Sequence, residues 1–288
     1  MSAPTLADVV TVLEDLYPPR TAEGWDAVGL VAGDPTRPVH KVLLAVDPVA
    51  AVVDEAIEWG ADLLVTHHPL YLKPVTSVAA TTFKGAVVHR LLLAGCALHV
   101  AHTNADAAPR GVADALADLV GLVDREPLVA RTDDAERGIG RTGTLERPVT
   151  LREFAEHVAA VLPSTAQGVR VAGDLDALVS TAAVVGGSGD SLFDAVRAAR
   201  ADVYLTADLR HHPASELRER AAFESAGATA TDTGTPYLVD VAHFASEWPW
   251  LAYAAADLAA RFEEGTVTTR VSTRVTDPWS ARLASSGR

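Results

Sequence analysis

The sequence predicts an α/β protein with two interlinked, topologically related α/β domains and mixed, largely parallel sheets. Short apolar runs alternate with helical patterns, the alternation occurs in both halves of the chain, and two stretches resemble each other at a constant offset of 140 residues. Strand–helix–strand connections place consecutive strands in parallel with a right-handed crossover. The alternation therefore favours parallel strands in each half.

The first half begins with a helix and continues with three strands separated by helices. Thr5 and Asp8 form a capping-box pattern before apolar residues at helical spacing, and Pro18-Pro19 ends that helix. Three apolar runs of strand length and two helical patterns then alternate. The runs are VLLAVDP (42–48), DLLVTHHP (62–69) and CALHVAHT (96–103), and the helical patterns cover residues 50–60 and 83–95.

The second half repeats this scheme. Residues 54–66 align with residues 194–206, and identical residues stand at four of the aligned positions. The ends of the two copies differ, because His67-His68 corresponds to Ala207-Asp208 and a second pair, His211-His212, comes four residues later. We expect one unit to carry ligands and its copy to be reshaped.

Composition excludes several classes of function. The 288 residues carry a net charge of −14, and only Lys41, Lys73 and Lys84 are lysine, which argues against nucleic acid as a partner. The single cysteine, Cys96, lies in an apolar run, so internal disulfides and thiolate metal clusters are excluded. The amino-terminal segment lacks a secretory pattern and no apolar run is long enough for a bilayer, so we expect a cytoplasmic protein with no membrane partner.

Polar side chains follow the predicted strands where each strand ends. His67 and His68 close the second apolar run, and Pro69 forces the chain out of the sheet, which lets two neighbouring imidazoles converge. His102 and Asp106 follow the third run in the same relative position. In an open α/β sheet, functional groups gather beyond the carboxyl ends of parallel strands. Asp106 also suits a plain turn.

A third polar group follows a short strand predicted for residues 237–241. His243 and Glu247 have the spacing of two ligands one helical turn apart. Pro249 instead favours a helix that starts near Ser246, with His243 in the preceding turn and Glu247 in the first turn. In that position Glu247 also suits a simple helix-dipole role.

Together these positions supply three imidazoles and two carboxylates. The mixture suits zinc, iron, manganese or nickel, whereas an oxygen-only set would indicate magnesium or calcium. Five ligands exceed the need of one catalytic zinc with an open position, and a carboxylate that bridges two ions about 3.5–4 Å apart explains the surplus. The sequence therefore predicts two divalent transition-metal ions per chain, with the ligands His67, His68, Asp106, His243 and Glu247.

The ligand positions and the repeat suggest domain boundaries. We expect a first domain of residues 1–127 and 240–288, carrying most of the metal ligands, and a second domain of residues 128–239. The charged, glycine-containing segment 131–148 is expected to begin as a loop or linker. Thr150 and Glu153 then form a second capping box at the start of a helix.

Three further loops have less specific patterns. Residues 186–189, with three glycines, suit either an anion-binding loop or a tight turn, and they lack the lysine of a P-loop. The irregular stretch around Trp25 is interpreted as a packed loop with an aromatic anchor. Residues 225–236 form a small-residue loop without a helical or strand period.

These segments together resemble the GTP cyclohydrolase I type 2 homolog family, also described as Ngg-interacting-factor-three-like dinuclear metal proteins. The resemblance rests on WDAVGLVAGD, THHPL, HTNADAAPRGVADALA, GGSGDSL, ADVYLTADLRHH and HFASE, which span nearly the whole chain. It implies metal binding by the same five residues, and two interlinked α/β domains that assemble into a toroidal homohexamer, a trimer of dimers. This chain has Ala27 where the family usually has asparagine, and its linker is too short for the inserted domain of longer relatives.

Two functions are compatible with this pattern. The first is a dinuclear metal-dependent hydrolase acting on a nucleotide or another small molecule, in the GTP cyclohydrolase version through metal-activated water that attacks the guanine imidazole ring. His102 and His211 are then candidate proton carriers, and no residue is assigned as catalytic. The alternative is a non-catalytic metal-binding ring with a regulatory or scaffold role. A phosphoesterase is less favoured because the ligand motifs contain no lysine or arginine.

Overall fold

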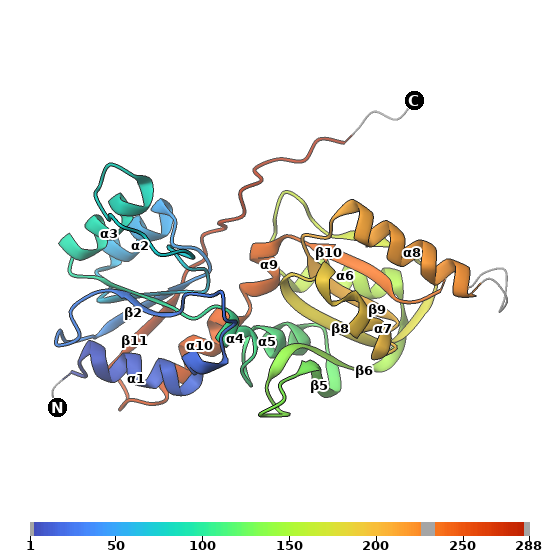
Figure 1. The fold of residues 1–288 in the computed structure, drawn as a ribbon, viewed down its shortest axis with the longest axis horizontal. Helices are drawn as coiled ribbons and strands as arrows, with labels where there is room; N and C mark the ends of the chain where they lie inside the picture. Colours follow the sequence, from blue (N-terminus) through green and yellow to red (C-terminus); the bar gives the residue numbers. More distant parts are fainter. Residues whose placement is uncertain (1–2, 226–233, 285–288) are drawn as a thin grey trace. The chain divides into compact units, whose positions relative to one another are not determined.

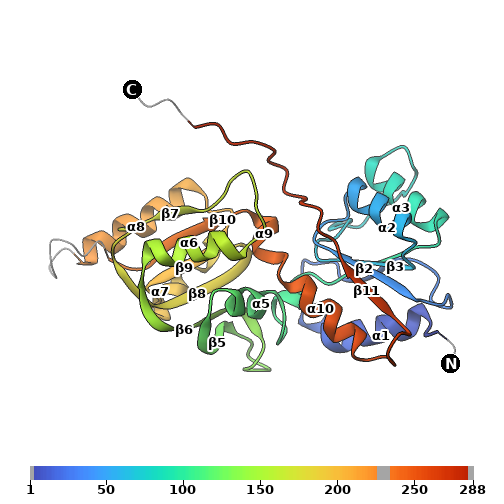
Figure 2. The same ribbon diagram turned by 180° about the vertical axis from the view of Figure 1, so that it is seen from behind.

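The structure is a computed structural model that describes residues 3–225 and 234–284, and Figures 1 and 2 show its ribbon from opposite sides. The described chain divides into two compact units. Unit 1 comprises the residues up to Gly111 together with Trp250–Thr276, and unit 2 comprises Val112–Pro249 and the residues from Asp277. Each unit contains one mixed sheet with helices packed on it, which confirms the predicted α/β fold class. The predicted domain boundaries at residues 127 and 240 stay a prediction.

Unit 1 is built on a largely parallel sheet. Its strand order is β1-β4-β3-β2-β11, in which β1 is antiparallel to β4 and the other neighbours are parallel. The strands are β1 (Gly29–Ala32), β2 (Lys41–Ala45), β3 (Leu63–Thr66), β4 (Ala97–Val100) and β11 (Thr268–Val271). The three central strands are buried on both faces, which explains why they read as continuous apolar runs.

Helices cover both faces of this sheet. Helices α2 (Ala50–Trp59) and α3 (Phe83–Leu93) pack on the face formed by Leu43, Leu64 and Leu98. Figure 1 shows α1 (Leu6–Leu16) and α10 (Trp250–Ala259) on the opposite face. A short helix, α4 (Thr103–Asp106), follows β4, and a single 3₁₀ turn covers Pro19–Thr21.

Unit 2 contains a six-stranded mixed sheet with the order β5-β6-β8-β9-β10-β7. Strands β8, β9 and β10 are parallel to one another, and the other neighbours are antiparallel. The strands are β5 (Leu122–Ala130), β6 (Gly138–Thr150), β7 (Arg170–Ala172), β8 (Leu178–Ser188), β9 (Val203–Ala207) and β10 (Tyr237–Val241). The helices are α5 (Val112–Leu119), α6 (Leu151–Val161), α7 (Phe193–Ala198), α8 (His211–Ser225) and α9 (His243–Glu247), with a 3₁₀ turn at Asp190–Leu192.

Both predicted capping boxes are confirmed. The Thr5 backbone N–H donates to Asp8 over 2.8 Å, and the Asp8 N–H donates back to the Thr5 hydroxyl over 3.3 Å. Thr150 and Glu153 make the same pair of bonds at the start of α6, at 2.8 and 3.1 Å. Each box satisfies two backbone donors that the first turn of a helix leaves without a partner inside the helix.

The segment 131–148 begins as the predicted loop, but most of its length is a strand that was not predicted. Only residues 131–137 form a turn, and from Gly138 the chain is strand β6, which pairs with β5 and β8. Glycine permits this close pairing, because a Cβ atom at Gly138 would lie 2.2 Å from the Val129 carbonyl oxygen. The charged residues that suggested a linker lie on a β-hairpin beside the edge of the sheet.

The two sheets share the predicted repeat. The order β2–α2–β3–α3–β4 in unit 1 corresponds to β8–α7–β9–α8–β10 in unit 2. Residues at the same register positions of the two sheets also differ by 140 in number. This holds for the third strand of each repeat, β4 and β10, which the sequence alignment had not included. Val42, Leu63 and Ala97 pair in a row in unit 1, and Ala182, Val203 and Tyr237 pair in unit 2.

The aspartates shared by the two copies perform the same structural role. Asp62 accepts hydrogen bonds from the backbone N–H groups of His40 and Lys41, at 2.8 and 2.9 Å. Asp202 accepts the corresponding bonds from Ser180 and Thr181, at 2.8 and 3.0 Å. The shared aspartate is therefore explained by the start of a parallel strand pair, and ligand chemistry is not needed to account for it.

Other sequence expectations concern the surface and the cysteine. Cys96 is buried, as its apolar surroundings predict, and burial raises the pKa of its thiol to about 12. Among the described residues, no helix is both long and apolar enough to cross a bilayer. Most of the 225–236 loop, residues 226–233, lies outside the described residues.

Candidate metal centre

Three histidines meet at the carboxyl ends of β3 and β4 in unit 1. His67 and His68 directly follow β3, and His102 precedes α4 after β4. The ring centroids of His67 lie 5.1 Å from those of both His68 and His102. One ring nitrogen of each of the three histidines lies within 4.8 Å of the others, which is a grouping that can hold a metal ion.

The local backbone explains how two adjacent histidines reach one place. The backbone N–H groups of His67 and His68 still donate to Ala45 and Val46, at 3.1 and 2.9 Å. The hydroxyl of Thr66 donates to the His68 carbonyl oxygen over 2.9 Å and closes a turn. The chain therefore leaves the strand at the histidines, where the alternation of side chains between sheet faces ends.

Each histidine of this group has an acceptor on its Nδ1 atom. His67 Nδ1 lies 3.0 Å from the carbonyl oxygen of Ala101, which can only accept, so Nδ1 carries the proton. His68 Nδ1 lies 2.7 Å from Asp47, and His102 Nδ1 lies 2.9 Å from Asp26. These bonds leave the Nε2 lone pair of each ring available to a metal ion or a proton, and metal-binding histidines have such acceptors.

Asp106, the last residue of α4, extends this group. Its Oδ1 atom lies 3.7 Å from His67 Nε2, too far for a direct hydrogen bond. Two ligands bonded to one ion at about 2.0–2.2 Å lie roughly 3–3.5 Å apart, so the observed separation is slightly longer than that of two ligands of one metal. Trp250, fully buried, packs its ring 5.4 Å from the ring of His67 and limits the positions that the imidazole can adopt.

The loop before β1 contributes Asp26 to the site, and the interpretation of Trp25 as its packed anchor is wrong. Trp25 is 59% exposed, whereas the carboxylate of Asp26 is buried. Burial by itself would raise the pKa of Asp26, but the hydrogen bonds from His102 and Thr103 outweigh it and hold the pKa well below its usual range. The hydroxyl and backbone N–H of Thr103 donate to Asp26 over 2.5 and 3.1 Å. The carboxylate, held by these donors, fixes the loop.

Unit 2 carries the other two predicted ligands. His243 begins the short helix α9 and Glu247 ends it, so a helix start near Ser246 is wrong and the spacing of one helical turn is correct. Their atoms Nε2 and Oε1 lie 2.9 Å apart. Pro249 lies between α9 and α10, where a missing backbone donor costs neither helix a bond. Glu247 is buried, and His243 is partly exposed.

Asp208 orients His243. Its Oδ2 atom lies 2.7 Å from His243 Nδ1, which again leaves Nε2 as the ligand atom. Asp208 takes a left-handed backbone conformation, with φ of 55°, directly after β9. In the 140-residue alignment it occupies the position of His68. The copy in unit 2 has thus replaced a candidate ligand by a residue that supports one.

The glycine loop at the end of β8 packs against these ligands. A Cβ atom at Gly187 would lie 2.6 Å from Glu247 Oε1 and 3.1 Å from His243 Nε2, so only glycine fits there. The Gly187 N–H donates to the hydroxyl of Ser246 over 2.8 Å, and the Gly189 N–H is directed to the Ala207 carbonyl oxygen. Both donors are used inside the protein, which favours the tight-turn interpretation over an anion-binding loop.

The donor chemistry of both groups fits a divalent transition metal. Unit 1 offers imidazole nitrogens and the carboxylate of Asp106, and unit 2 offers His243 and Glu247, each group with its own supporting acceptors. The sequence had not singled out Asp26, Asp47 or Asp208 as supports, and it had placed His102 only as a proton carrier. For Asp208, the feature of the sequence that could have pointed to the site was its alignment with His68 at the offset of 140 residues.

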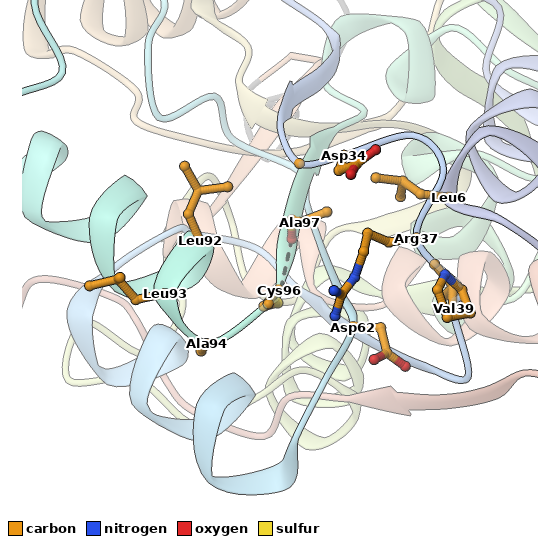
Figure 3. Close-up of a pocket in the computed structure, with 13 residues that line it drawn as sticks. Leu6, Asp34, Arg37, Val39, Asp62, Leu92, Leu93, Ala94, Cys96 and Ala97 are labelled. Carbon is orange, nitrogen blue, oxygen red and sulfur yellow. Dashed lines mark hydrogen bonds between the residues drawn. The ribbon is translucent and has the colours of Figure 1, made fainter.

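A separate cavity in unit 1 does not belong to this site. Its volume is about 440 Å³, and Figure 3 shows Arg37 beside Cys96 and Asp62 among the residues that line it. Asp62 and Ala97 stand at the amino ends of β3 and β4, whereas the histidines follow the carboxyl ends. The cavity therefore lies at the opposite edge of the sheet from the metal ligands.

The fold and this site define a two-unit α/β protein with a histidine- and carboxylate-rich candidate metal centre. The chain belongs to the Duf34/NIF3 (NGG1p interacting factor 3) family, whose model matches residues 4–278. A protein of Streptomyces coelicolor called GTP cyclohydrolase 1 type 2 homolog is 53% identical over 286 residues, which cover 98% of this chain and 96% of the relative.

Two further comparisons extend this result. A Mycobacterium tuberculosis protein with the same name is 37% identical over 381 aligned residues, covering 96% of both chains, so the relative contains residues without a counterpart here. A solved structure of a hypothetical protein from Staphylococcus aureus is 27% identical and superposes with a TM-score of 0.84, covering 97% of this chain and 100% of that one. The structural similarity therefore includes both units.

Asp208→Asn tests the supporting role of the carboxylate. We expect metal affinity to fall by about 10–100-fold. The variant keeps the shape of the side chain but loses the negative charge that accepts the hydrogen bond from His243 Nδ1. Asparagine tolerates the left-handed backbone of this position, so the fold should persist. Asp124→Asn is the matched control, since Asp124 is exposed and also has a positive φ, of 49°. Titration with zinc monitored by calorimetry compares the two; equal affinities would contradict the assigned role.

Proposed function

We propose that this chain is a metal-dependent hydrolase of the GTP cyclohydrolase type, in which two divalent transition-metal ions are held by His67, His68, Asp106, His243 and Glu247. The observation that carries the proposal is the state of the imidazoles in both units. Each has its Nδ1 on a carboxylate or carbonyl acceptor, so that its Nε2 lone pair is available as a ligand. The five residues supply more ligands than one ion needs, which supports two ions per chain.

The residues around the ligands suggest which groups would activate water and which would transfer protons. When bound, the ions supply Lewis acidity and lower the pKa of a coordinated water towards neutrality. His102 is the proposed proton carrier, because Asp26 accepts from its Nδ1 and leaves Nε2 to take up and return a proton. The low pKa of Asp26 keeps its carboxylate ionised, which stabilises the imidazolium formed in between. Trp250 excludes water from one side of His67.

Guanine nucleotides are the proposed first substrates to examine. The support is the printed name of the Streptomyces relative, which is 53% identical. In this proposal one water opens the guanine imidazole ring to a formamide, and a second water hydrolyses the formamide and releases formate. His211, the first residue of α8, is given no role in this proposal.

The test combines metal analysis with turnover. We expect untagged protein to contain about two transition-metal ions per chain by elemental analysis, and the reloaded protein to release formate from GTP. His102→Gln should keep its metal and lose turnover by about 10²–10⁴-fold, the usual contribution of a general acid–base group. His89→Gln, on the exposed surface of α3, is the control. Stoichiometric metal with no turnover of any nucleotide would overturn the hydrolase and favour a scaffold role.

Assembly into a homohexamer, a trimer of dimers, is part of the proposal and rests on family membership. Light scattering coupled to size-exclusion chromatography measures it directly. We expect a mass of about six chains of 30.2 kDa at micromolar concentration. A stable monomer under those conditions would remove the ring from the proposal and leave the metal site within one chain.

A further inference from the structure

The segment that follows β11 reaches the support of a metal ligand in unit 1. Strand β11 is an edge strand that pairs in parallel with β2, beside which Figure 2 shows it, and β2 pairs in parallel with β3. The three neighbouring strands therefore end at the same edge of the sheet. The segments that follow β11, β2 and β3 contain Thr276, Asp47 and His68, respectively, and all three residues belong to unit 1.

The pairing register brings Asp47 beside His68. Ala45 pairs with Thr66 in the last row of β2 and β3, so Asp47 and His68 stand at equivalent positions beyond that row. Asp47 Oδ1 lies 2.7 Å from His68 Nδ1, and the carboxylate favours the tautomer with the proton on Nδ1. Both side chains are mostly buried, so a donor from the protein also stabilises the second oxygen of the carboxylate.

Thr276 supplies this donor. Its hydroxyl donates to Asp47 Oδ2, the oxygen that does not face His68. Each carboxylate oxygen thus has its own donor, and rotation of the carboxylate would weaken both hydrogen bonds. A carboxylate held at both oxygens keeps the proton of His68 on Nδ1 and the Nε2 lone pair available to a metal ion.

The segment between β11 and Thr276 is itself held in place. The backbone N–H of Ser272 donates to the Leu44 carbonyl oxygen over 2.8 Å and continues the pairing with β2. The Ser272 hydroxyl donates to Glu55 of α2 over 2.7 Å, and the Arg274 N–H donates to that hydroxyl over 3.2 Å. The position of Thr276 is therefore set by contacts with β2 and α2.

We propose that Thr276 is a positioning residue of the metal centre, a role that rests on the metal binding by His68 proposed above. It acts through Asp47 and contributes no ligand of its own. A hydroxyl suits this position because it orients the carboxylate without neutralising the negative charge that strengthens His68 as a ligand. The segment after β11 thereby becomes part of the support of the site, although the sequence places it far from every ligand of unit 1.

Thr276→Val tests this role, because it removes the hydroxyl and keeps the shape of the side chain. Loss of a direct support of a ligand costs about 10–100-fold in metal affinity, and for a residue one bond further out we expect zinc to bind about 3–10-fold more weakly in calorimetric titration. Thr276→Ser keeps the donor and should retain the affinity of the unmodified protein. Thr273→Val is the matched control, since Thr273 is exposed on the same segment. Equal weakening by both valine variants would contradict the role.

A double-variant cycle separates positioning from a general effect on the segment. Asp47→Asn removes the negative charge through which Thr276 acts, so the addition of Thr276→Val should weaken zinc binding no further. A purely structural role predicts that the two losses in affinity add. Full additivity would overturn the proposal.

The tautomer of His68 provides a measurement that needs no metal. Long-range ¹H–¹⁵N spectra of the metal-free protein, at a pH at which the ring is neutral and with His68→Gln for assignment, should show the proton on Nδ1. Thr276→Val should increase the share of the other tautomer. Unmodified protein that binds no metal would overturn the proposed function, and the tautomer would still show whether Thr276 acts on His68. An unchanged tautomer with unchanged zinc affinity would rule the role out.

Discussion

Glu247→Gln is expected to lower bound metal from about two ions per chain towards one, while the fold persists. The variant keeps the shape of the side chain but removes the negative charge that offsets the repulsion between two dications a few ångströms apart. Glu247 is buried and its Oε1 lies 2.9 Å from His243 Nε2, beside Gly187 of the β8 loop, where a Cβ atom would lie 2.6 Å from Oε1. Elemental analysis and zinc titration of the purified variant measure the change.

The position of Glu247 in α9 argues against the alternative that this carboxylate only interacts favourably with the helix dipole. A carboxylate in the first turn of a helix is favoured by the helix dipole, but Glu247 is the last residue of α9, where the dipole disfavours it. Its replacement by glutamine should therefore cost little stability. His157→Gln is the control, since His157 is exposed on α6 and its Nε2 lies 2.8 Å from the Leu119 carbonyl oxygen. If Glu247→Gln still binds two ions, the bridging role assigned to this residue is wrong.

The second large effect concerns His99, which should make the protein sensitive to acid. His99 is 2% exposed in the middle of β4, and neither ring nitrogen has a hydrogen-bond partner among the described residues. Burial lowers its pKa from 6.5 to about 4. Above pH 6.5 His99 is neutral in both states. Below that value the unfolded chain binds a proton that the folded chain does not, so stability falls until about pH 4.

The size of this effect follows from the pKa. A pKa lower by about 2.5 corresponds to about 3 kcal/mol of unfolding free energy, a large part of the total for an ordinary domain. His99→Leu removes the titrating group. The free energy of unfolding of the variant, relative to that of the unmodified protein, should therefore be about 3 kcal/mol higher at pH 4 than at pH 7. Urea unfolding at each pH measures the difference. His89→Leu, on the exposed surface of α3, should leave the pH dependence unchanged; parallel curves for His99→Leu and the unmodified protein would contradict the expectation.

Much of the fold could be predicted because its signals are local. Capping boxes at Thr5 and Thr150 depend on residues three positions apart, and buried parallel strands require continuous apolar runs. The repeat could be found because strand starts need the same aspartate in both copies, at Asp62 and Asp202. The strand at 138–148 was not predicted, because its glycines and the charged residues before it are also typical of a loop.

The sequence by itself determined which residue types the site contains, since imidazoles and carboxylates after strand ends are visible in the chain. Only the tertiary structure decided how they are oriented. Asp26 reaches His102 across 76 residues, Asp208 reaches His243 across 35, and Asp47 reaches His68 across 21. Hydrogen bonds between residues this far apart leave no periodic pattern in a sequence, because they depend on which strand ends become neighbours when the sheet forms. For the same reason the sequence pointed to Trp25 as the buried anchor of its loop. In the structure Trp25 is exposed, and the buried side chain that holds the loop is Asp26.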